Sequence, residues 1–213
     1  MAAKILLLNT KVEIQKTLDA AKTLTGITKA SPAVVTSTAH GYANGDIVVL
    51  AVAGMIELDG RACRVAAVSA NTFELEGVDS SAYTTFTSGT AQKISAWDSF
   101  GNVTQFSIPE PSPSRIDATT IHDVAKQELF GLDEAVQASM ILQADPLDVA
   151  VVNLRAASLA KATRGFRVTL QNGYKLVFNA YVAGGRGFDG QQGAVATAQA
   201  NFTFRNTESW FAS

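Results

Sequence analysis

The sequence predicts a mainly β protein with one α-helix and a small all-β segment set within the chain. Short strand-and-turn repeats fill residues 27–93. Two long alternating runs flank Asn172-Gly173, which is the pattern of a β-hairpin. Only the stretch that begins at Asp145-Pro146 carries clear helix-start signals.

The composition supports a folded chain and argues against several functions. Among 213 residues, 47% are apolar and 17% are charged, which is enough to build a core. A net charge of −2 lacks the excess of positive charge that is typical of proteins that bind nucleic acid tightly. The lone Cys63 cannot form an internal disulfide and is interpreted as a buried apolar residue. No signal peptide or membrane span is recognised, so we expect synthesis and folding in a cytoplasm.

The N-terminal elements are expected to be extended. Ile5–Leu8 and Val12–Lys16 are predicted strands, whereas Thr17–Leu24 is either a short helix or a linker. The segment Ile27–Lys93 then has three turn signals, each beside a short apolar run. These turns are His40-Gly41-Tyr42, Asn44-Gly45-Asp46 and Asp59-Gly60-Arg61. The runs are Ile47–Leu50, Cys63–Val68 and Thr72–Leu75. This pattern is typical of a compact barrel or sandwich.

A strand over Val103–Ile108 precedes Pro109–Ser114, whose three prolines predict an exposed stiff loop or a domain boundary. Ile116–Ile121 is predicted to be a short strand. Asp123–Leu132 is interpreted as a loop with one helical turn, and Ala135–Ala144 as a strand.

The predicted helix begins with Asp145 as N-cap and Pro146 at the first helical position, and it ends near Lys161. The hairpin that follows alternates Phe166, Val168 and Leu170 with polar residues, and its second strand runs from Leu176 to Val182. We therefore expect one buried face and one polar face, the latter with Arg167, Thr169, Lys175 and Asn179. A last strand is predicted at Asn201–Arg205.

Motifs for catalysis or cofactors are weak. Gly185–Gly190 matches G-x-G-x-x-G, but no βαβ unit surrounds it, so a hairpin loop is the preferred interpretation. His40 and His122 belong to no ligand-spaced cluster, and no serine lies in a nucleophile elbow. Asp46 and Asp59 are interpreted as turn residues that accept backbone N–H bonds. We expect no enzyme activity, no cofactor and no metal.

The 27–93 segment resembles a small β module, the FCCH domain, that recurs in phage tail proteins. The resemblance is carried by the three turns named above, of which the third is preceded by Leu58, by Gly54-Met55 and Val65, and by the run Asn71–Leu75. It is completed by Gly77-Val78-Asp79 and Tyr83–Gly89. With this segment set aside, residues 1–26 and 94–213 form the expected second, discontinuous domain.

That remainder resembles the tail tube (major tail) protein of long-tailed bacteriophages. The order of Ile116–Thr119, Glu128–Asp133, the helix from Asp145, the hairpin and the Gly-rich loop carries the resemblance. It implies a tail-tube-type β-sandwich or barrel with one flanking helix, and hexameric rings stacked into a hollow tube through which double-stranded DNA passes without tight binding.

The implied partners are copies of the chain, the tape measure, the tail terminator and baseplate or tip proteins, in a virion tail and with no membrane. Arg186, Phe188 and Asp189 are the candidate inter-ring contacts because their loop combines mixed charge with one aromatic ring. The alternative is a surface module that binds carbohydrate or a host receptor through the 27–93 segment. Carbohydrate sites usually present exposed aromatic side chains, and the segment offers only Tyr42, Phe73, Tyr83 and Phe86.

Overall fold

The computed structural model describes residues 9–212, so the strand expected at Ile5–Leu8 lies outside the described residues. Within this range the chain is mainly β with one α-helix, which confirms the predicted fold class. The strands of the first half are β1 (Lys11–Leu18), β2 (Lys22–Leu24), β3 (Gly26–Ile27), β4 (Ala33–Thr36), β5 (Ile47–Ala53), β6 (Ala62–Ala66), β7 (Thr72–Leu75) and β8 (Ser88–Ser99). Those of the second half are β9 (Val103–Ser107), β10 (Pro113–Asp117), β11 (Glu128–Asp133), β12 (Gln137–Gln143), β13 (Thr163–Thr169), β14 (Lys175–Gly184), β15 (Thr197–Phe204) and β16 (Ser209–Phe211).

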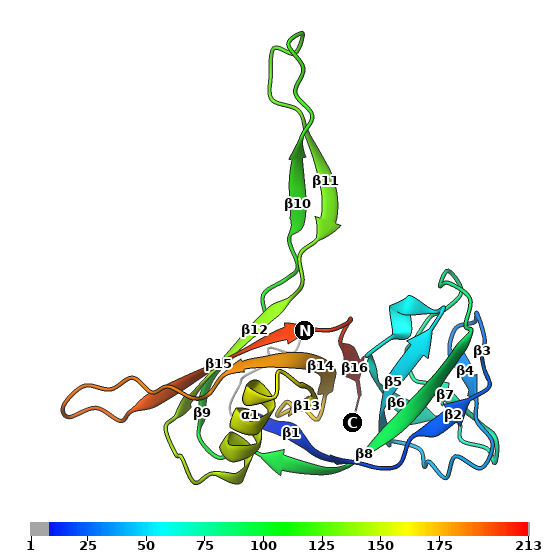
Figure 1. Cartoon of the computed structure of the whole chain (residues 1–213), viewed down its shortest axis with the longest axis horizontal. Coiled ribbons are helices and arrows are strands. Elements are labelled where there is room, and N and C mark those ends of the chain that lie inside the picture. Colours follow the sequence, from blue (N-terminus) through cyan, green and yellow to red (C-terminus); the bar gives the residue numbers. More distant parts are fainter. Residues whose placement is uncertain (1–8, 213) are drawn as a thin grey trace.

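One hydrogen-bonded path of strands runs through almost the whole molecule. Its order is β3-β4-β7-β6-β5-β8-β1-β13-β14-β15-β12-β9, with β16 added to β14 and β2 added to β8. The long strand β8 pairs with β5 over its first half and with β1 over its second half. It therefore links the 27–93 segment to the rest of the sheet, as the long green arrow in Figure 1 shows.

The larger core is built around four phenylalanines from β13, β14 and β15. The Phe166 ring lies 4.6 Å from Phe202 and 5.3 Å from Phe178, and Phe178 stacks on Phe204 at 4.3 Å between centroids. Strands β1 and β12 and one side of α1 (Val149–Leu159) complete this core. Contacts between aromatic rings stabilise a fold beyond the free energy gained by burying their area. These four rings form the centre of the larger core.

A second core lies inside the 27–93 segment and its immediate neighbours. Phe73, Leu50, Met55 and Leu75 are fully buried there, beside the 3-10 helix η1 (Ile56–Leu58). His40 is buried with them, where its ring packs against Tyr42 and Phe73.

The outer face of the β13–β14 hairpin is covered, which corrects the expectation of a polar, solvent-facing side. Val177 is fully buried with Ile47 and Phe211, and Asn179 is only 5% exposed. The Asn179 side chain donates a hydrogen bond to the Gly60 carbonyl oxygen at 2.9 Å. Alternation alone could not show this, because the covering residues come from the 27–93 segment and from β16.

Ion pairs and hydrogen bonds strengthen the same seam. Arg205 donates to Asp59 at 2.8 Å, and the Arg61 guanidinium donates to the Ser209 hydroxyl at 3.3 Å. Burial would raise the pKa of Asp59, but the Arg205 guanidinium and backbone N–H groups hold it below its usual value. Gly60 has φ +73°, and a Cβ there would meet the Arg205 side chain, so this close approach requires glycine.

The helix begins three residues later than predicted, because Asp148 rather than Asp145 is the N-cap. The Asp148 carboxylate accepts hydrogen bonds from the N–H groups of Ala150 at 2.8 Å and Val151 at 3.3 Å. Asp145 instead accepts from Leu147 and closes a turn ahead of the helix. The helix ends at Leu159, two residues before the expected Lys161.

Two other segments differ from expectation. Thr17–Leu24, left open between helix and linker, continues β1 to Leu18 and then contains β2. Asp123–Leu132, expected to be a loop with a helical turn, contains the start of strand β11. The apolar residues of β11 are exposed, so no alternation between buried and exposed positions marked it as a strand.

Candidate assembly surfaces

Strands β10 and β11 form an arm that projects from the rest of the molecule, at the top of Figure 1. They pair only with each other, in a separate two-stranded sheet. The register places Ile116 opposite Leu129 and Arg115 opposite Phe130. We use the name arm for residues 112–134.

The arm exposes large apolar side chains. Phe130 is 74% exposed and Leu132 is 88% exposed. Four more large apolar residues of the arm are also exposed: Ile116, Ile121, Val124 and Leu129. Soluble monomers rarely expose large apolar patches, so six exposed apolar side chains on one short arm make it a candidate site of contact with another molecule.

Local contacts only partly stabilise the arm. Glu128 accepts from Arg115 at 2.9 Å and from Lys126 at 2.7 Å, and these hydrogen bonds lower the pKa of its carboxyl group. Exposed ion pairs contribute little to stability, and an isolated two-stranded hairpin is marginally stable in water. Burial of its apolar side chains against another molecule would therefore stabilise the arm.

The Gly-rich loop between β14 and β15 holds Arg186, Phe188 and Asp189, the predicted inter-ring contacts. All three are exposed, Phe188 at 76%. The backbone of Asp189 exchanges two hydrogen bonds of 2.8 Å with Thr197, and Arg155 of α1 donates to the Gly185 carbonyl oxygen at 2.7 Å. The loop joins two antiparallel strands, so the motif lacks the strand-to-helix turn of a dinucleotide site.

The arm and the Gly-rich loop extend in different directions from the sandwich in Figure 1. The structure thus does not bring Arg186, Phe188 and Asp189 together with the arm. Reasoning from the sequence missed the apolar arm, although the run Glu128–Asp133 was singled out for its family resemblance. The apolar residues of this run, on the far side of a Pro-rich stretch, were the sequence signal that could have revealed the arm.

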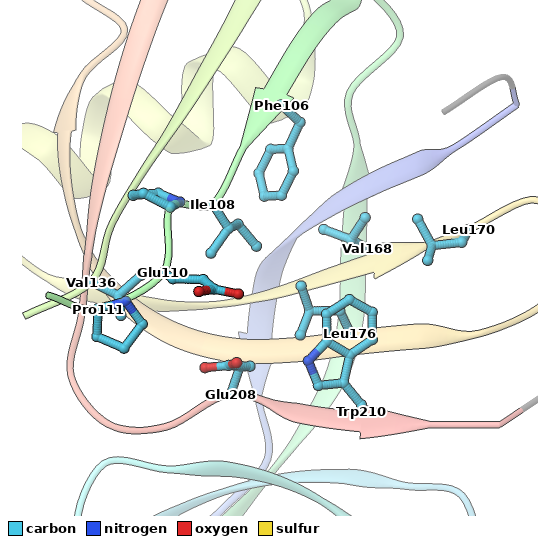
Figure 2. Close-up of a pocket in the computed structure, with 11 residues that line it drawn as sticks. Phe106, Ile108, Glu110, Pro111, Val136, Val168, Leu170, Leu176, Glu208 and Trp210 are labelled. Carbon is cyan, nitrogen blue, oxygen red and sulfur yellow. The ribbon is translucent and has the colours of Figure 1, made fainter. Parts of the chain in front are cut away.

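An apolar cavity of about 360 Å³ opens at one end of the sandwich. Figure 2 shows Phe106 and Ile108 on one side of it and Val168, Leu170 and Leu176 on the other. Trp210 of β16, which is 54% exposed, lies at the rim.

The turn residues of the 27–93 segment have structural partners. Asp46 accepts from the Ala43 N–H at 2.8 Å and Asp59 from the Val52 N–H at 3.1 Å, as predicted. His40 accepts from the Tyr42 N–H at 3.0 Å through Nδ1, and its Nε2 lies 3.0 Å from the Ser69 carbonyl oxygen. Burial raises the pKa of the Cys63 thiol to about 11, so this thiol is not a reactive nucleophile.

The aromatic residues of the 27–93 segment do not form a carbohydrate platform. Tyr42 is buried and donates to the Ala91 carbonyl oxygen at 2.8 Å, and Phe73 is fully buried. Tyr83 and Phe86 are half-buried against the same core. The segment therefore lacks the exposed rings that carbohydrate sites usually present.

Within residues 9–212, no group of His, Cys, Asp and Glu side chains is arranged to hold a metal ion. The described helix is also too short and insufficiently apolar to cross a membrane.

The fold and its exposed arm define a class: a mainly β chain with one helix and a projecting hairpin that exposes apolar side chains. The chain belongs to the family described as phage tail tube protein, whose model matches residues 53–212, or 160 of the 213 residues. Among curated proteins, none matches the chain.

Family membership makes the chain a structural component of a phage tail and implies assembly with copies of itself and other tail components. The match begins inside the 27–93 segment, at residue 53, and does not separate that segment from the rest. Its assignment as an inserted FCCH-like domain, with residues 1–26 and 94–213 as the tail tube domain, stays a proposal.

Proposed function

We propose that six copies of this chain form a ring and that the rings stack into the hollow tail tube through which double-stranded DNA passes. The observation that carries this proposal is the arm, which projects from the rest of the molecule (Figure 1) and whose apolar side chains are exposed. A neighbouring copy would bury Phe130 and Leu132 and stabilise the two-stranded hairpin.

The positions of the two candidate surfaces support a repeating assembly. The arm leaves the sandwich in one direction and the loop with Arg186, Phe188 and Asp189 leaves it in another. When different surfaces of one subunit meet on successive copies, the contacts are heterologous, and they generate closed rings or open filaments. In our proposal the arm and this loop supply contacts within and between rings.

The charge balance suits a conduit. A strongly basic wall would bind phosphates through counterion release and hold the DNA, whereas the net charge of −2 favours passage without tight binding. The 27–93 segment would lie on the outside of the tube, because a folded unit of that size in the lumen would obstruct DNA. The tape measure, the tail terminator and baseplate or tip proteins are the proposed partners in the virion, after synthesis in the host cytoplasm.

Electron microscopy and sedimentation of the purified full-length chain test this proposal. We expect rings or tubes for the natural sequence and unassembled protein for Phe130→Asp, because a carboxylate at that position opposes burial of the arm. Thr38→Asp is the matched control: it adds the same charge at an exposed position of the 27–93 segment and should assemble normally.

The circular dichroism spectrum and melting temperature of unassembled Phe130→Asp should match those of the unassembled natural chain, because the side chain lies outside both cores. A natural chain that stays monomeric at all concentrations, or a Phe130→Asp variant that forms normal tubes, would refute the proposed role of the arm.

A further inference from the structure

The cavity beside Trp210 combines apolar walls with acidic side chains. Phe106 and Ile108 form part of the walls, and about 360 Å³ between them and the opposite wall is unfilled (Figure 2). The charged residues that line the cavity, Glu110 and Glu208, are both acidic. Apolar walls in contact with water are unfavourable in proportion to their area, so an apolar group that entered would be stabilised. The two carboxylates would attract a cation beside that group.

The Gly-rich loop between β14 and β15 carries groups that complement this cavity. Phe188 is 76% exposed, and Arg186, two residues before it, is also exposed. Two residues of extended chain span at most about 7 Å, so one site can receive the phenyl ring and the guanidinium together. Within residues 9–212, no salt bridge involves Arg186, Glu110 or Glu208. Asp189 of the loop is acidic, so the attraction to the cavity comes from Arg186.

The cavity and the loop lie at opposite ends of β14. Leu176, which lines the cavity, is opposite Trp210 at the start of this strand, and the loop follows Gly184 at its end. The ten residues of β14 span about 30 Å at roughly 3.3 Å per residue. Backbone hydrogen bonds between Asp189 and Thr197 continue the pairing beyond β14, and Figure 1 shows the loop extending away from the sandwich. The loop therefore cannot fill the cavity of its own copy.

We propose that the Phe188 ring of one copy enters the cavity beside Trp210 of a second copy and places the Arg186 guanidinium next to Glu110 and Glu208. An apolar cavity of about 150 Å³ is enough to hold a benzene ring. The 360 Å³ available here therefore accommodates a phenyl side chain. Aromatic and arginine side chains that enter pockets supply much of the binding energy of protein interfaces.

A second copy is the occupant because every copy carries both halves of the contact at opposite ends. Joining one end of a subunit to the other end of the next makes a heterologous contact, which repeats from copy to copy. The contact rests on the proposed ring assembly, and it specifies which surfaces meet between successive rings.

Sedimentation of full-length variants over a range of concentrations tests the energetic role of the loop. Phe188→Ala should raise the protein concentration needed for assembly by at least about tenfold, because it removes an aromatic side chain buried at the interface. Val195→Ala is the matched control, since Val195 is 66% exposed on the same loop, and it should assemble like the natural chain. Arg186→Gln should also weaken assembly, whereas Asp189→Asn should not, because only Arg186 is opposite in charge to the two glutamates.

Disulfide trapping tests the position of the loop. Full-length Gly187→Cys and Pro109→Cys variants are mixed, assembled and mildly oxidised. A Cβ at Gly187 meets no atom within 4 Å, and Pro109 lines the cavity. Peptide mass spectrometry should identify a disulfide between position 187 of one chain and position 109 of another. A mixture with Thr38→Cys in place of Pro109→Cys should give none, and the natural chain checks that the buried Cys63 takes no part.

The outcomes separate this contact from the ring proposal. If the natural chain assembles, then normal assembly of Phe188→Ala, or absence of the disulfide between positions 187 and 109, would each overturn the inference and leave the ring proposal to its own test. If the natural chain forms no assembly at any concentration, the ring proposal fails and the contact fails with it. The melting temperature of unassembled Phe188→Ala should equal that of the unassembled natural chain, because Phe188 lies outside the cores.

Discussion

Replacing Glu13 by glutamine tests how the buried middle of β1 is stabilised. Glu13 is only 4% exposed, and its carboxylate accepts from the Arg167 guanidinium at 2.6 Å and pairs with the Lys11 ammonium at 2.7 Å. Burial alone would raise the pKa of Glu13, but the hydrogen bonds and charges of Arg167 and Lys11 outweigh it and lower the pKa below 4.5.

The sign of the pH dependence follows from that lowered pKa. A carboxyl group whose pKa is lower in the folded state stabilises the fold fully above its unfolded pKa of about 4.5, and this stabilisation is lost as the pH falls through the folded value. Glu13→Gln removes the charge and leaves Arg167 without its partner. Because Lys11 and Arg167 keep some contact with solvent, we expect a loss of about 1–3 kcal/mol at pH 7 rather than the larger cost of a fully buried pair.

Urea unfolding of dilute, unassembled protein at a series of pH values measures this effect. The difference in unfolding free energy between the natural chain and Glu13→Gln should be largest near pH 7 and should shrink as the pH falls below about 4.5. Glu134→Gln, which changes an exposed carboxylate of the arm, should show almost no difference. A Glu13→Gln variant as stable as the natural chain at pH 7, or a difference that does not change with pH, would refute the reasoning.

Three further predictions concern the core, the helix and the thiol. Phe178→Ala should lower the unfolding free energy by about 3–5 kcal/mol, because Phe178 is fully buried between Phe166 and Phe204; a loss below about 1 kcal/mol in chemical denaturation would contradict this packing. Asp148→Ala should cost about 1 kcal/mol by the same assay, while Asp145→Ala should cost less, since only Asp148 caps the helix. If the pKa of Cys63 is raised to about 11, a thiol reagent at pH 8 should modify Cys63 only after unfolding, and rapid modification of the native chain would show that the thiol is accessible.

Local patterns predicted much of the main sheet. The alternation on both sides of Asn172-Gly173 predicted the β13–β14 hairpin, and the structure contains it. Gly173 has φ +85°, a conformation that a tight turn requires and glycine adopts easily. The strand predicted at Asn201–Arg205 corresponds to the second half of β15, which begins four residues earlier, at Thr197. Such elements depend on interactions between neighbours in the sequence, and for this reason one sequence is sufficient to recognise them.

Features that depend on distant contacts could not be predicted in this way. Asn179 was expected on a polar face, yet it is buried because Gly60 approaches it from 119 residues away. The choice of Asp148 over Asp145 as N-cap depended on which carboxylate could reach the N–H groups of Ala150 and Val151.

The candidate assembly surface shows the same limit. The sequence pointed to Arg186, Phe188 and Asp189, which the structure places on an exposed loop, and it missed the exposure of Phe130 and Leu132. A strand whose apolar residues face solvent breaks the relation between hydrophobicity and burial on which such predictions depend. The family resemblance carried information about the arm that alternation did not.

Cryo-electron microscopy of the assembled full-length chain tests the central claim most directly. We predict sixfold rings stacked around a continuous lumen wide enough for double-stranded DNA, with Phe130 and Leu132 of each arm buried against a neighbouring copy. Assemblies with another symmetry, filaments without a lumen, or rings in which the arm stays exposed to solvent would contradict the account.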